Sequence, residues 1–236
     1  MNLILLHPDD FLSDSLVRLT GRRLEHVASI HRAKPGDSLA VGMLGGKIGQ
    51  GRITYLNKQA LEMEICLTQD PPPKLPLTLV VALPRPKALS RVVASATSMG
   101  IARIVFMNAW KVEKSYWKSP RLSEANLLQH CVLGLEQAKD TVLPELLLAR
   151  FFAPFVNEEL PRLASQTRCL VAHPYADAPC PLGIKEPCTL ALGPEGGFIP
   201  DELAAIERIG FQPVRLGPRI LRTETAISAL VGRLFL

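Results

Sequence analysis

The chain lacks the features that mark several common classes of protein. Its five cysteines are odd in number and show no CxxC spacing, which argues against a disulfide framework and a zinc site and favours free thiols in a reducing cytosol. Its longest apolar runs, at residues 3–6 and 77–83, are too short to span a bilayer. No basic segment precedes the first apolar residues, so we expect no signal peptide, no membrane partner and a cytoplasmic location.

A dinucleotide-binding fingerprint is missing as well. That fingerprint places G-x-G-x-x-G directly after a strand, with an acidic residue about 20 positions later. After the apolar run at 77–83 the chain instead has the sequence PRPKAL. A nucleotide-dependent oxidoreductase is therefore a weak hypothesis.

What the chain does have is a core-forming composition and a mild excess of basic charge. Its 236 residues suit one large domain or two small ones, and 47% are hydrophobic. Residues 1–73 hold eight basic and eight acidic side chains, so the net charge of +5 comes from the remainder, with 19 basic and 14 acidic. The excess favours an anionic partner only mildly, because ordinary surface charge explains it equally well.

The first 70 residues have the pattern of a small β-rich unit. Short strand-like stretches are separated by Gly45-Gly46 and Asn57-Lys58, which suit tight turns, and this succession suggests a small barrel. The strand candidates are residues 38–44, 48–55 and 61–67. Two earlier stretches, 11–19 and 22–30, are expected to be short helices. A proline-rich segment at 70–76 can join neither helix nor sheet, and it divides the chain into predicted domains at 1–72 and 73–236.

The second part has the pattern of an α/β domain. The continuous apolar run at 77–83 predicts a strand buried on both faces, as in parallel sheets. A helical stretch at 88–99 and a strand at 101–107 complete a βαβ unit. Further helices are expected at 119–135 and 151–163, and further strands at 167–172 and 188–192.

A basic and aromatic loop follows residue 107. Between Arg85 and Arg121 there are eight Lys or Arg and one acid, with Trp110, Tyr116 and Trp117 interleaved. Basic side chains contact phosphates and aromatic rings stack on unpaired bases, so the loop is a candidate RNA surface. The candidate RNA-binding residues are Lys111, Lys114 and Trp117. A lid whose aromatic rings pack inward explains the pattern about equally well.

Two glycine- and proline-bearing loops, 193–197 and 217–222, stand out near the C-terminus. Each follows a short apolar run and opens into a helix: Pro200 suits a first helical turn, and Thr223 can cap a helix with one apolar face. Loops at strand ends are natural small-molecule sites in α/β folds. One such loop would be an ordinary turn, but two with charged residues inside or beside them favour a site. Those residues are Glu195, Arg219, Arg222 and Glu224.

The two loops resemble a known signature. GPEGG at 193–197, followed by LGPRILRTETA at 216–226, is similar to the motifs of the 16S rRNA uridine-N3 methyltransferases. The resemblance extends over the whole chain and is weaker before about residue 170. It implies an α/β fold with a C-terminal SPOUT-type parallel sheet, a deep trefoil knot and an N-terminal PUA-like β-barrel. It also implies an S-adenosylmethionine-dependent rRNA methyltransferase that works as a homodimer on 16S rRNA or the 30S subunit.

The resemblance also assigns roles. Donor contacts fall on loop backbone and apolar walls, with Glu195 ordering its loop or binding polar groups of the donor. Arg219 and Arg222 are candidates to stabilise the N3 anion of uridine, and Glu224 could orient one of them. Arg32 and Lys34 become RNA-facing candidates, while His173 is expected to be a loop histidine. The implied cofactor-binding residues are Leu192, Gly193, Glu195, Gly196, Leu216, Gly217, Ile220 and Leu221.

The chain departs from the family pattern at three positions. Ser95 and Ser98 stand where the family has Lys and Glu, and Asp140 stands where it has arginine. The donor motifs are intact, so these departures indicate an altered RNA-facing surface. A paralogue that methylates another nucleotide, or a non-catalytic RNA-binding module of the same fold, therefore remains an alternative.

Overall fold

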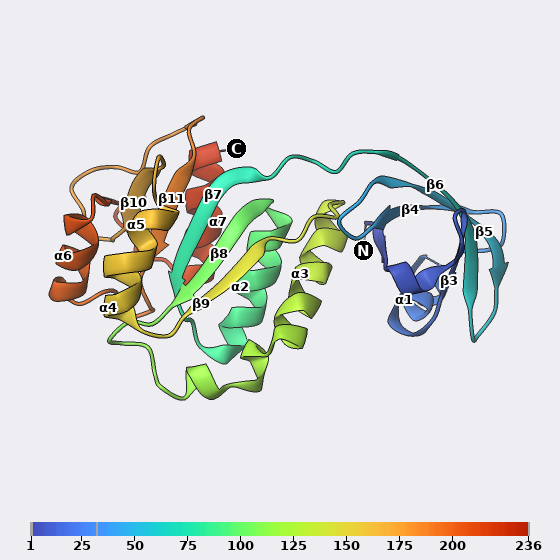
Figure 1. Ribbon diagram of the computed structural model, residues 1–236, viewed down its shortest axis with the longest axis horizontal. Helices are drawn as coiled ribbons and strands as arrows, with labels where there is room; N and C mark the ends of the chain where they lie inside the picture. The colour runs from blue at the N-terminus through green and yellow to red at the C-terminus, as the bar shows by residue number, and fades with distance from the viewer. Residues whose placement is uncertain (1, 32, 236) are drawn as a thin grey trace. The chain divides into compact units, whose positions relative to one another are not determined.

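A computed structural model describes residues 2–31 and 33–235. The chain divides into two compact units. One holds the residues up to Pro73 together with Val132–Leu143, and the other holds Lys74–Cys131 and the residues from Pro144 onward. Figure 1 shows their helices and strands in chain order.

The first unit is built on a six-stranded sheet with the order β1-β4-β5-β6-β3-β2. All neighbouring pairs are antiparallel except β1 with β4. One sheet face packs over an apolar core that includes Val17, Leu61 and Met63. The elements are β1 (Ile4–Leu6), β2 (Phe11–Ser13), β3 (Leu16–Leu19), α1 (Gly21–His26), η2 (Val27–His31), β4 (Ser38–Met43), β5 (Ile48–Leu56) and β6 (Leu61–Gln69).

The helix expected at 11–19 is wrong. This stretch forms β2 and β3, which pair antiparallel, and β3 continues into an antiparallel pair with β6. Val17 and Leu19 are fully buried while Arg18 between them is exposed, and this alternation is the period of a strand. The second expected helix is confirmed, as α1 continued by the π-helix η2. Strand β1 had no counterpart among the predicted elements.

The first unit also contains a segment that the sequence assigned to the second domain. Helix α3 (Glu124–Ala138) begins in the second unit and ends in the first. Leu135 packs with Leu3 and Leu5, and the Glu136 carbonyl accepts hydrogen bonds from the amides of Asn2 and Leu3 at 3.0 Å each. The boundary predicted at residue 73 therefore omits 132–143, because burial of Leu135 depends on contacts over 130 positions apart, which no local pattern reveals.

The second unit is built on a parallel six-stranded sheet with the order β12-β10-β11-β7-β8-β9. The central strands β7 and β11 are buried along nearly their whole length, as their continuous apolar runs predict. Strand β9 at the edge was not predicted. The strands are β7 (Leu75–Ala82), β8 (Ile101–Met107), β9 (Glu145–Ala149), β10 (Arg168–Ala172), β11 (Cys188–Leu192) and β12 (Gln212–Val214).

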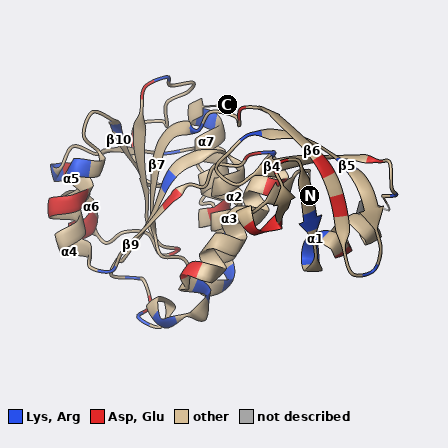
Figure 2. Cartoon of the chain, turned by 45° about the vertical axis from the view of Figure 1, so that its right-hand side comes forward, with Lys and Arg blue, Asp and Glu red and all other residues tan. Residues whose placement is uncertain are grey.

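Helices cover both faces of this sheet. In Figures 1 and 2, α2 and α7 lie on one face and α4, α5 and α6 on the other, which is why apolar side chains run without alternation through the central strands. The helices are α2 (Pro86–Ser98), η3 (Tyr116–Lys118), η4 (Pro120–Leu122), α4 (Phe152–Pro154), η5 (Phe155–Glu159), α5 (Leu160–Leu163), α6 (Pro200–Arg208) and α7 (Thr223–Phe235). The expected apolar face of α7 is confirmed by burial of Ile227, Leu230, Val231 and Leu234.

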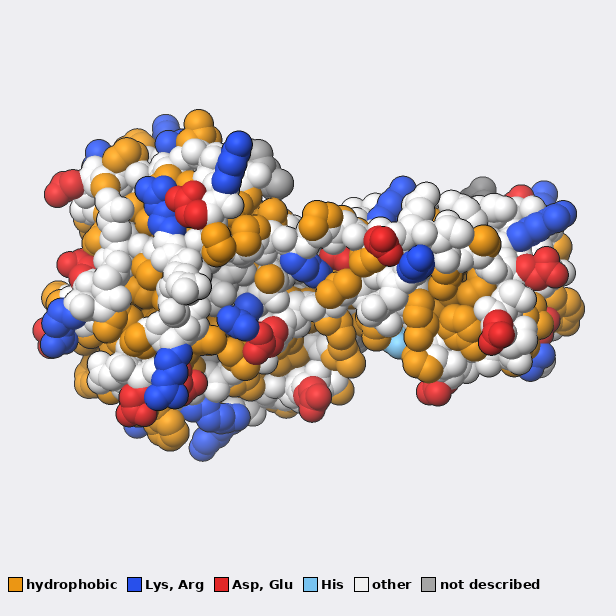
Figure 3. All heavy atoms as spheres, turned by 45° about the horizontal axis from the view of Figure 1, so that its top comes forward, with side chains coloured by type: hydrophobic (Ala, Val, Ile, Leu, Met, Phe, Trp, Pro, Cys, Tyr) orange, Lys and Arg blue, Asp and Glu red, His pale blue; other side chains and the backbone are white. Residues whose placement is uncertain are grey.

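Basic and acidic side chains are interspersed on the face that Figure 3 shows. The five cysteines are free thiols, and three of them are buried.

Among residues 2–31 and 33–235, none of the helices combines the length and the apolar character that crossing a membrane requires.

We predict that Leu135→Ala loosens the first unit. Leu135 is fully buried, so truncation should lower that unit's free energy of unfolding by about 2–5 kcal/mol. Hydrogen exchange at the paired amides of β1 and β4 should accelerate accordingly. Leu133→Ala, on the same helix at 38% exposure, is the matched control and should change stability by less than about 0.5 kcal/mol. Unchanged exchange in β1 after Leu135→Ala would contradict the assignment of 132–143 to the first unit.

Candidate functional site

Three neighbouring strands end level with one another in the second unit. Ala172, the last residue of β10, pairs with Leu192 at the end of β11 and with Val214 at the end of β12. The chain leaves each strand here as a loop, and because all three strands are parallel the loops emerge at one edge of the sheet. A cavity of about 350 Å³ lies among these loops.

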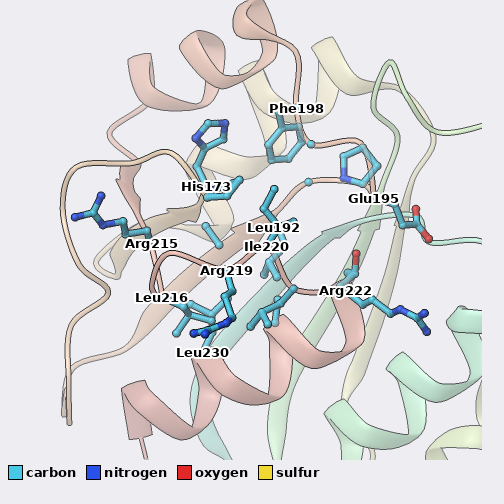
Figure 4. A pocket seen from close by; sticks show the side chains of 18 of the residues that line it. His173, Leu192, Glu195, Phe198, Arg215, Leu216, Arg219, Ile220, Arg222 and Leu230 are labelled. Carbon is cyan, nitrogen blue, oxygen red and sulfur yellow. The ribbon is translucent and has the colours of Figure 1, made fainter.

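The cavity is apolar in its interior and charged at its rim. Figure 4 shows Leu192, Leu216 and Ile220 grouped in the cavity, with Phe198 and His173 above them and Leu230 of α7 below. The side chains of Glu195 and Arg222 extend to one side and that of Arg215 to the other. An apolar concavity of this size with a few polar groups is typical of a small-molecule site.

The first loop, 193–198, folds back closely on itself. A Cβ added at Gly193 would lie 2.9 Å from the Phe198 nitrogen, so only glycine fits there. Gly197 has a φ of +69° and donates its amide to the Pro194 carbonyl at 2.8 Å. The loop therefore depends on these two glycines for its shape.

Glu195, in the same loop, pairs with a residue that follows β7. Arg85 Nε donates to Glu195 Oε1 at 3.1 Å. This hydrogen bond, and then the carboxylate charge, raise the pKa of Arg85 above its ordinary value. The pair is largely exposed at the cavity rim, so it adds little stability, but it neutralises the charge of Glu195.

The second loop carries two arginines without partners. Within residues 2–31 and 33–235, neither Arg219 nor Arg222 has a hydrogen bond or an ion pair from its side chain, and both line the cavity. An exposed guanidinium that no carboxylate occupies keeps its donors free for an anion. The rim of the cavity is therefore suited to a negatively charged ligand group.

Glu224 has a different partner from the one that the sequence suggested. Arg91 of α2 donates to Glu224 Oε1 at 3.1 Å. The pKa of Glu224 is lowered, first by a hydrogen bond from its own backbone N–H and further by Arg91 and the charge of Arg222, against a partial burial that raises it. Glu224 thus anchors the start of α7 to α2, and its influence on Arg222 is through charge alone.

A third loop, after β8, is fixed to the first one. The buried carboxylate of Glu202, at 6% exposure, accepts the Trp110 amide at 2.7 Å and the Ile199 amide at 3.1 Å. Lys111 Nζ donates to the Gly196 carbonyl at 2.6 Å. The basic loop of the sequence is therefore attached directly to the GPEGG loop through Lys111 and to the start of α6 through Glu202, which also binds the amide of Ile199.

The structure brings most of the predicted residues together. Gly196 and Glu224 lie beside the cavity without lining it, and Gly196 contacts Lys111 instead. The residues that line the cavity among those predicted are Leu192, Gly193, Glu195, Leu216, Gly217, Arg219, Ile220, Leu221 and Arg222.

The predicted RNA-binding residues are spread more widely. Arg32 lies outside the described residues, and Lys34 is exposed in a turn of the first unit. Lys114 is exposed in the loop after β8. Trp117 faces inward: its Nε1 donates to Asn108 Oδ1 at 3.0 Å, and the Arg150 guanidinium lies 5.4 Å from its ring centre.

Several lining residues escaped the sequence reasoning. Arg85 could have been found from the rule that ligands bind at the carboxyl ends of parallel strands, since it follows β7. His173 follows β10 by the same rule, although the sequence analysis favoured a loop role for it. Phe198 and Thr223 had no comparable signal, because their place in the cavity depends on how the loops fold.

The position of Asp140 corrects the prediction that this residue, which stands where the family has arginine, alters the RNA-facing surface. It is 2% exposed, and its Oδ1 accepts the amides of Thr141 at 2.7 Å and Val142 at 3.0 Å. The residue therefore shapes the chain after α3 and does not present an altered RNA-facing surface. Ser98 is half-buried and donates to the Ser95 carbonyl within α2 at 2.9 Å.

The fold and the cavity define a class: an α/β protein with a small-molecule site at the carboxyl ends of parallel strands. A family model described as an RNA methyltransferase domain matches residues 71–234. The chain belongs to this RNA methyltransferase family, and the resemblance drawn from the two loop motifs is confirmed at that level.

Individual relatives agree with the family. The chain is similar to "Ribosomal RNA small subunit methyltransferase E" of Treponema pallidum, with 26% identity over 97% of this chain and 88% of that one. The protein of the same name from Mycobacterium bovis is 28% identical over 88% of this chain and 81% of its own length. The crystal structure of the Neisseria gonorrhoeae protein of that name, bound to S-adenosyl methionine, has the same fold, with a TM-score of 0.74, 24% identity and coverage of 98% and 95% of the two chains.

We predict that Glu202→Gln loosens both loops at the cavity. The amide side chain keeps one acceptor oxygen, so one of the two partly buried backbone N–H groups loses its partner, which costs about 1 kcal/mol. Hydrogen exchange should accelerate at the amides of Trp110 or Ile199, and urea denaturation should report the lower stability. Glu207→Gln, an exposed position on the same helix, is the control and should leave both measurements unchanged.

Proposed function

We propose that the protein transfers a methyl group from S-adenosylmethionine to N3 of a uridine in 16S rRNA, and that it does so in the cytoplasm. One observation carries this proposal above the others: the cavity is lined by GPEGG and LGPRILRTETA, and the second loop places at its rim two guanidinium groups that have no partner in the part of the chain that the structure describes. One guanidinium could bind the carboxylate of the donor, and the other would remain for a negative charge on the acceptor.

The cavity suits the donor in size and chemistry. A volume of about 350 Å³ lies in the range of small-molecule sites. The apolar side chains of Leu192, Leu216 and Ile220 fit an adenine ring, and the exposed backbone groups of the loops fit its polar edge. When bound, S-adenosylmethionine supplies an electrophilic methyl group on a sulfonium centre.

The arginines fit the demand of the acceptor. Uridine N3 carries a proton, and the nitrogen becomes a good nucleophile only when that proton is lost. A permanently charged guanidinium stabilises the resulting anion and so favours the deprotonated form at the site. Arg219 and Arg222 are the candidates for this role.

No carboxylate at the rim is placed to act as a free base. Glu195 is bound to Arg85 and Glu224 to Arg91. Each carboxylate therefore orders its loop or helix, and the proton of N3 passes to solvent while the arginines hold the negative charge. In this proposal the enzyme accelerates the reaction by electrostatic stabilisation of the N3 anion.

We propose the predicted domain roles along with this activity. The sequence predicted a PUA-like RNA-binding barrel at residues 1–72 and a methyltransferase domain with a deep trefoil knot at 73–236; we propose these roles for the first and second units, with 132–143 counted in the first. A knot requires the end of the chain to lie against an earlier loop, and the proposal draws on such an arrangement: the loop between β10 and β11 is hydrogen-bonded to Arg215 after β12 and also to Arg233 and Leu234 at the end of α7. The last helix is thus held by a loop that precedes it by some 50 residues.

We predict that Arg222→Ala lowers methyl transfer by about 10²–10³-fold and leaves donor affinity nearly unchanged, because the guanidinium stabilises charge that develops on the acceptor. Calorimetry with S-adenosylmethionine and transfer of labelled methyl groups to 30S subunits measure the two quantities. Arg208→Ala on α6, an exposed arginine that donates within its own helix, is the matched control.

The same pair of assays separates the alternatives. Loss of donor binding together with transfer would assign Arg222 to the donor site instead. Donor binding by the wild-type protein without transfer to 30S subunits would favour a paralogue that acts on another nucleotide. RNA binding without donor binding, in a folded protein, would leave a non-catalytic RNA-binding module.

We also predict a homodimer. Ile220 and Leu221 both line the cavity, yet they are 69% and 39% exposed, and exposed apolar side chains that lie together at a site are often covered by a partner. Light scattering at micromolar concentration should give twice the chain mass of 25.9 kDa. A mass of one chain would reject the prediction.

A further inference from the structure

We infer that Trp110 is a stacking platform for an unpaired RNA base at the edge of the donor cavity. The inference rests on the proposed function and adds to it the residue that would position the substrate. Its starting point is exposure, because the Trp110 side chain is 78% exposed. A large aromatic ring held in water is unusual in an ordered loop, since its burial would be worth several kcal/mol.

The backbone beneath this ring is fixed. The Trp110 amide is bound by the buried Glu202 carboxylate at 2.7 Å, and the neighbouring Val112 is 7% exposed. Lys111 Nζ holds the Gly196 carbonyl at 2.6 Å. The exposed ring is therefore presented from an anchored loop, which lowers the entropy lost when a ligand stacks on it.

The ring also lies at the correct edge of the sheet. Trp110 follows the carboxyl end of β8, and β8 is separated from β11 by β7 alone. Two strand spacings amount to about 10 Å. The hydrogen bond from Lys111 to Gly196, and that from the Trp110 amide to Glu202 at the start of α6, then hold the backbone of Trp110 near the GPEGG loop, which carries Glu195.

The surroundings select a nucleic acid as the occupant. Lys114, Lys118 and Arg121 are exposed on the segment that follows Trp110, which forms the lower edge of Figure 2. Exposed cations on the same segment as an exposed aromatic ring match a phosphodiester chain with unpaired bases, since bases stack on the ring and phosphates bind the cations.

The second tryptophan of the chain serves as the internal contrast. Trp117 is half-buried, its Nε1 is bound to Asn108 and its face is covered by Arg150. Its ring is therefore held in place and occupied on one face. The two rings belong to one loop, yet Trp117 packs against its neighbours and Trp110 is exposed.

This contrast gives a direct experiment. Trp117→Phe leaves Trp110 as the only tryptophan, and Trp110→Phe leaves only Trp117, because the chain has two. Each variant, checked for folding by circular dichroism, is titrated with a short oligouridylate while tryptophan emission is recorded. We expect saturable quenching in the Trp117→Phe protein and none in the Trp110→Phe protein. Inorganic polyphosphate, which has charge and no bases, should quench neither.

Kinetics complete the test. Trp110→Ala should raise KM for 30S subunits roughly tenfold, because stacking on one base contributes about that factor or more, and Trp110→Phe should restore most of the loss. Donor affinity measured by calorimetry should not change. If Trp110 emission changes on dilution of the protein and not with RNA, the ring is covered by a second copy of the chain and the inference is overturned.

The outcomes for the inference and for the proposed function are distinct. Methyl transfer by the wild-type protein with no quenching of Trp110 would reject the stacking platform and keep the enzyme. Quenching by oligouridylate in a protein that transfers no methyl group would keep the platform and reject the enzyme. Equal quenching by polyphosphate would show a charge effect and reject stacking.

Discussion

The site depends on one constraint: β10 pairs in parallel with both β11 and β12, and the three strands end level at Ala172, Leu192 and Val214. Because the strands are parallel, segments that are about 20 residues apart in the chain leave the sheet at one point. The GPEGG loop and the arginine-bearing loop can then line one cavity although they are not adjacent in the sequence. Loss of this register by one residue would turn the cavity-facing ends of the strands to the other face of the sheet.

Charge at the cavity follows a simple division. The carboxylates at the rim are each bound by an arginine from elsewhere in the second unit, Glu195 by Arg85 and Glu224 by Arg91, whereas Arg219 and Arg222 have no partner among the described residues. Paired charges at an exposed rim contribute little to stability but fix loop positions. The unpaired ones make the rim electropositive, which a site for an anionic acceptor requires and a purely structural loop does not.

The motifs and the strands of the second unit were predictable because they are local. Continuous apolar runs predicted β7 and β11, and the spacing of glycines predicted the two loops that line the cavity. The wrong predictions share one cause: the structure of these segments depends on residues that are distant in the sequence. Residues 11–19 form strands because Val17 and Leu19 pair with β6, and 132–143 joins the first unit because Leu135 packs on Leu5. Likewise, composition could not tell which tryptophan of the basic loop packs inward, since Asn108 and Arg150 decide that.

The burial of Asp140 bears on the choice between the enzyme of the proposed function and a paralogue. An arginine replaced by aspartate on an RNA-facing surface would remove a phosphate contact and reverse the local charge. Asp140 instead accepts two backbone amides in the interior of the first unit, where an aspartate ends α3 and starts the turn that follows. The Ser98 hydroxyl likewise donates within α2, to the Ser95 carbonyl, and neither serine lines the cavity. The departures from the family pattern thus act on the scaffold, and the residues that would distinguish one RNA target from another must be sought among the exposed cations and the ring of Trp110.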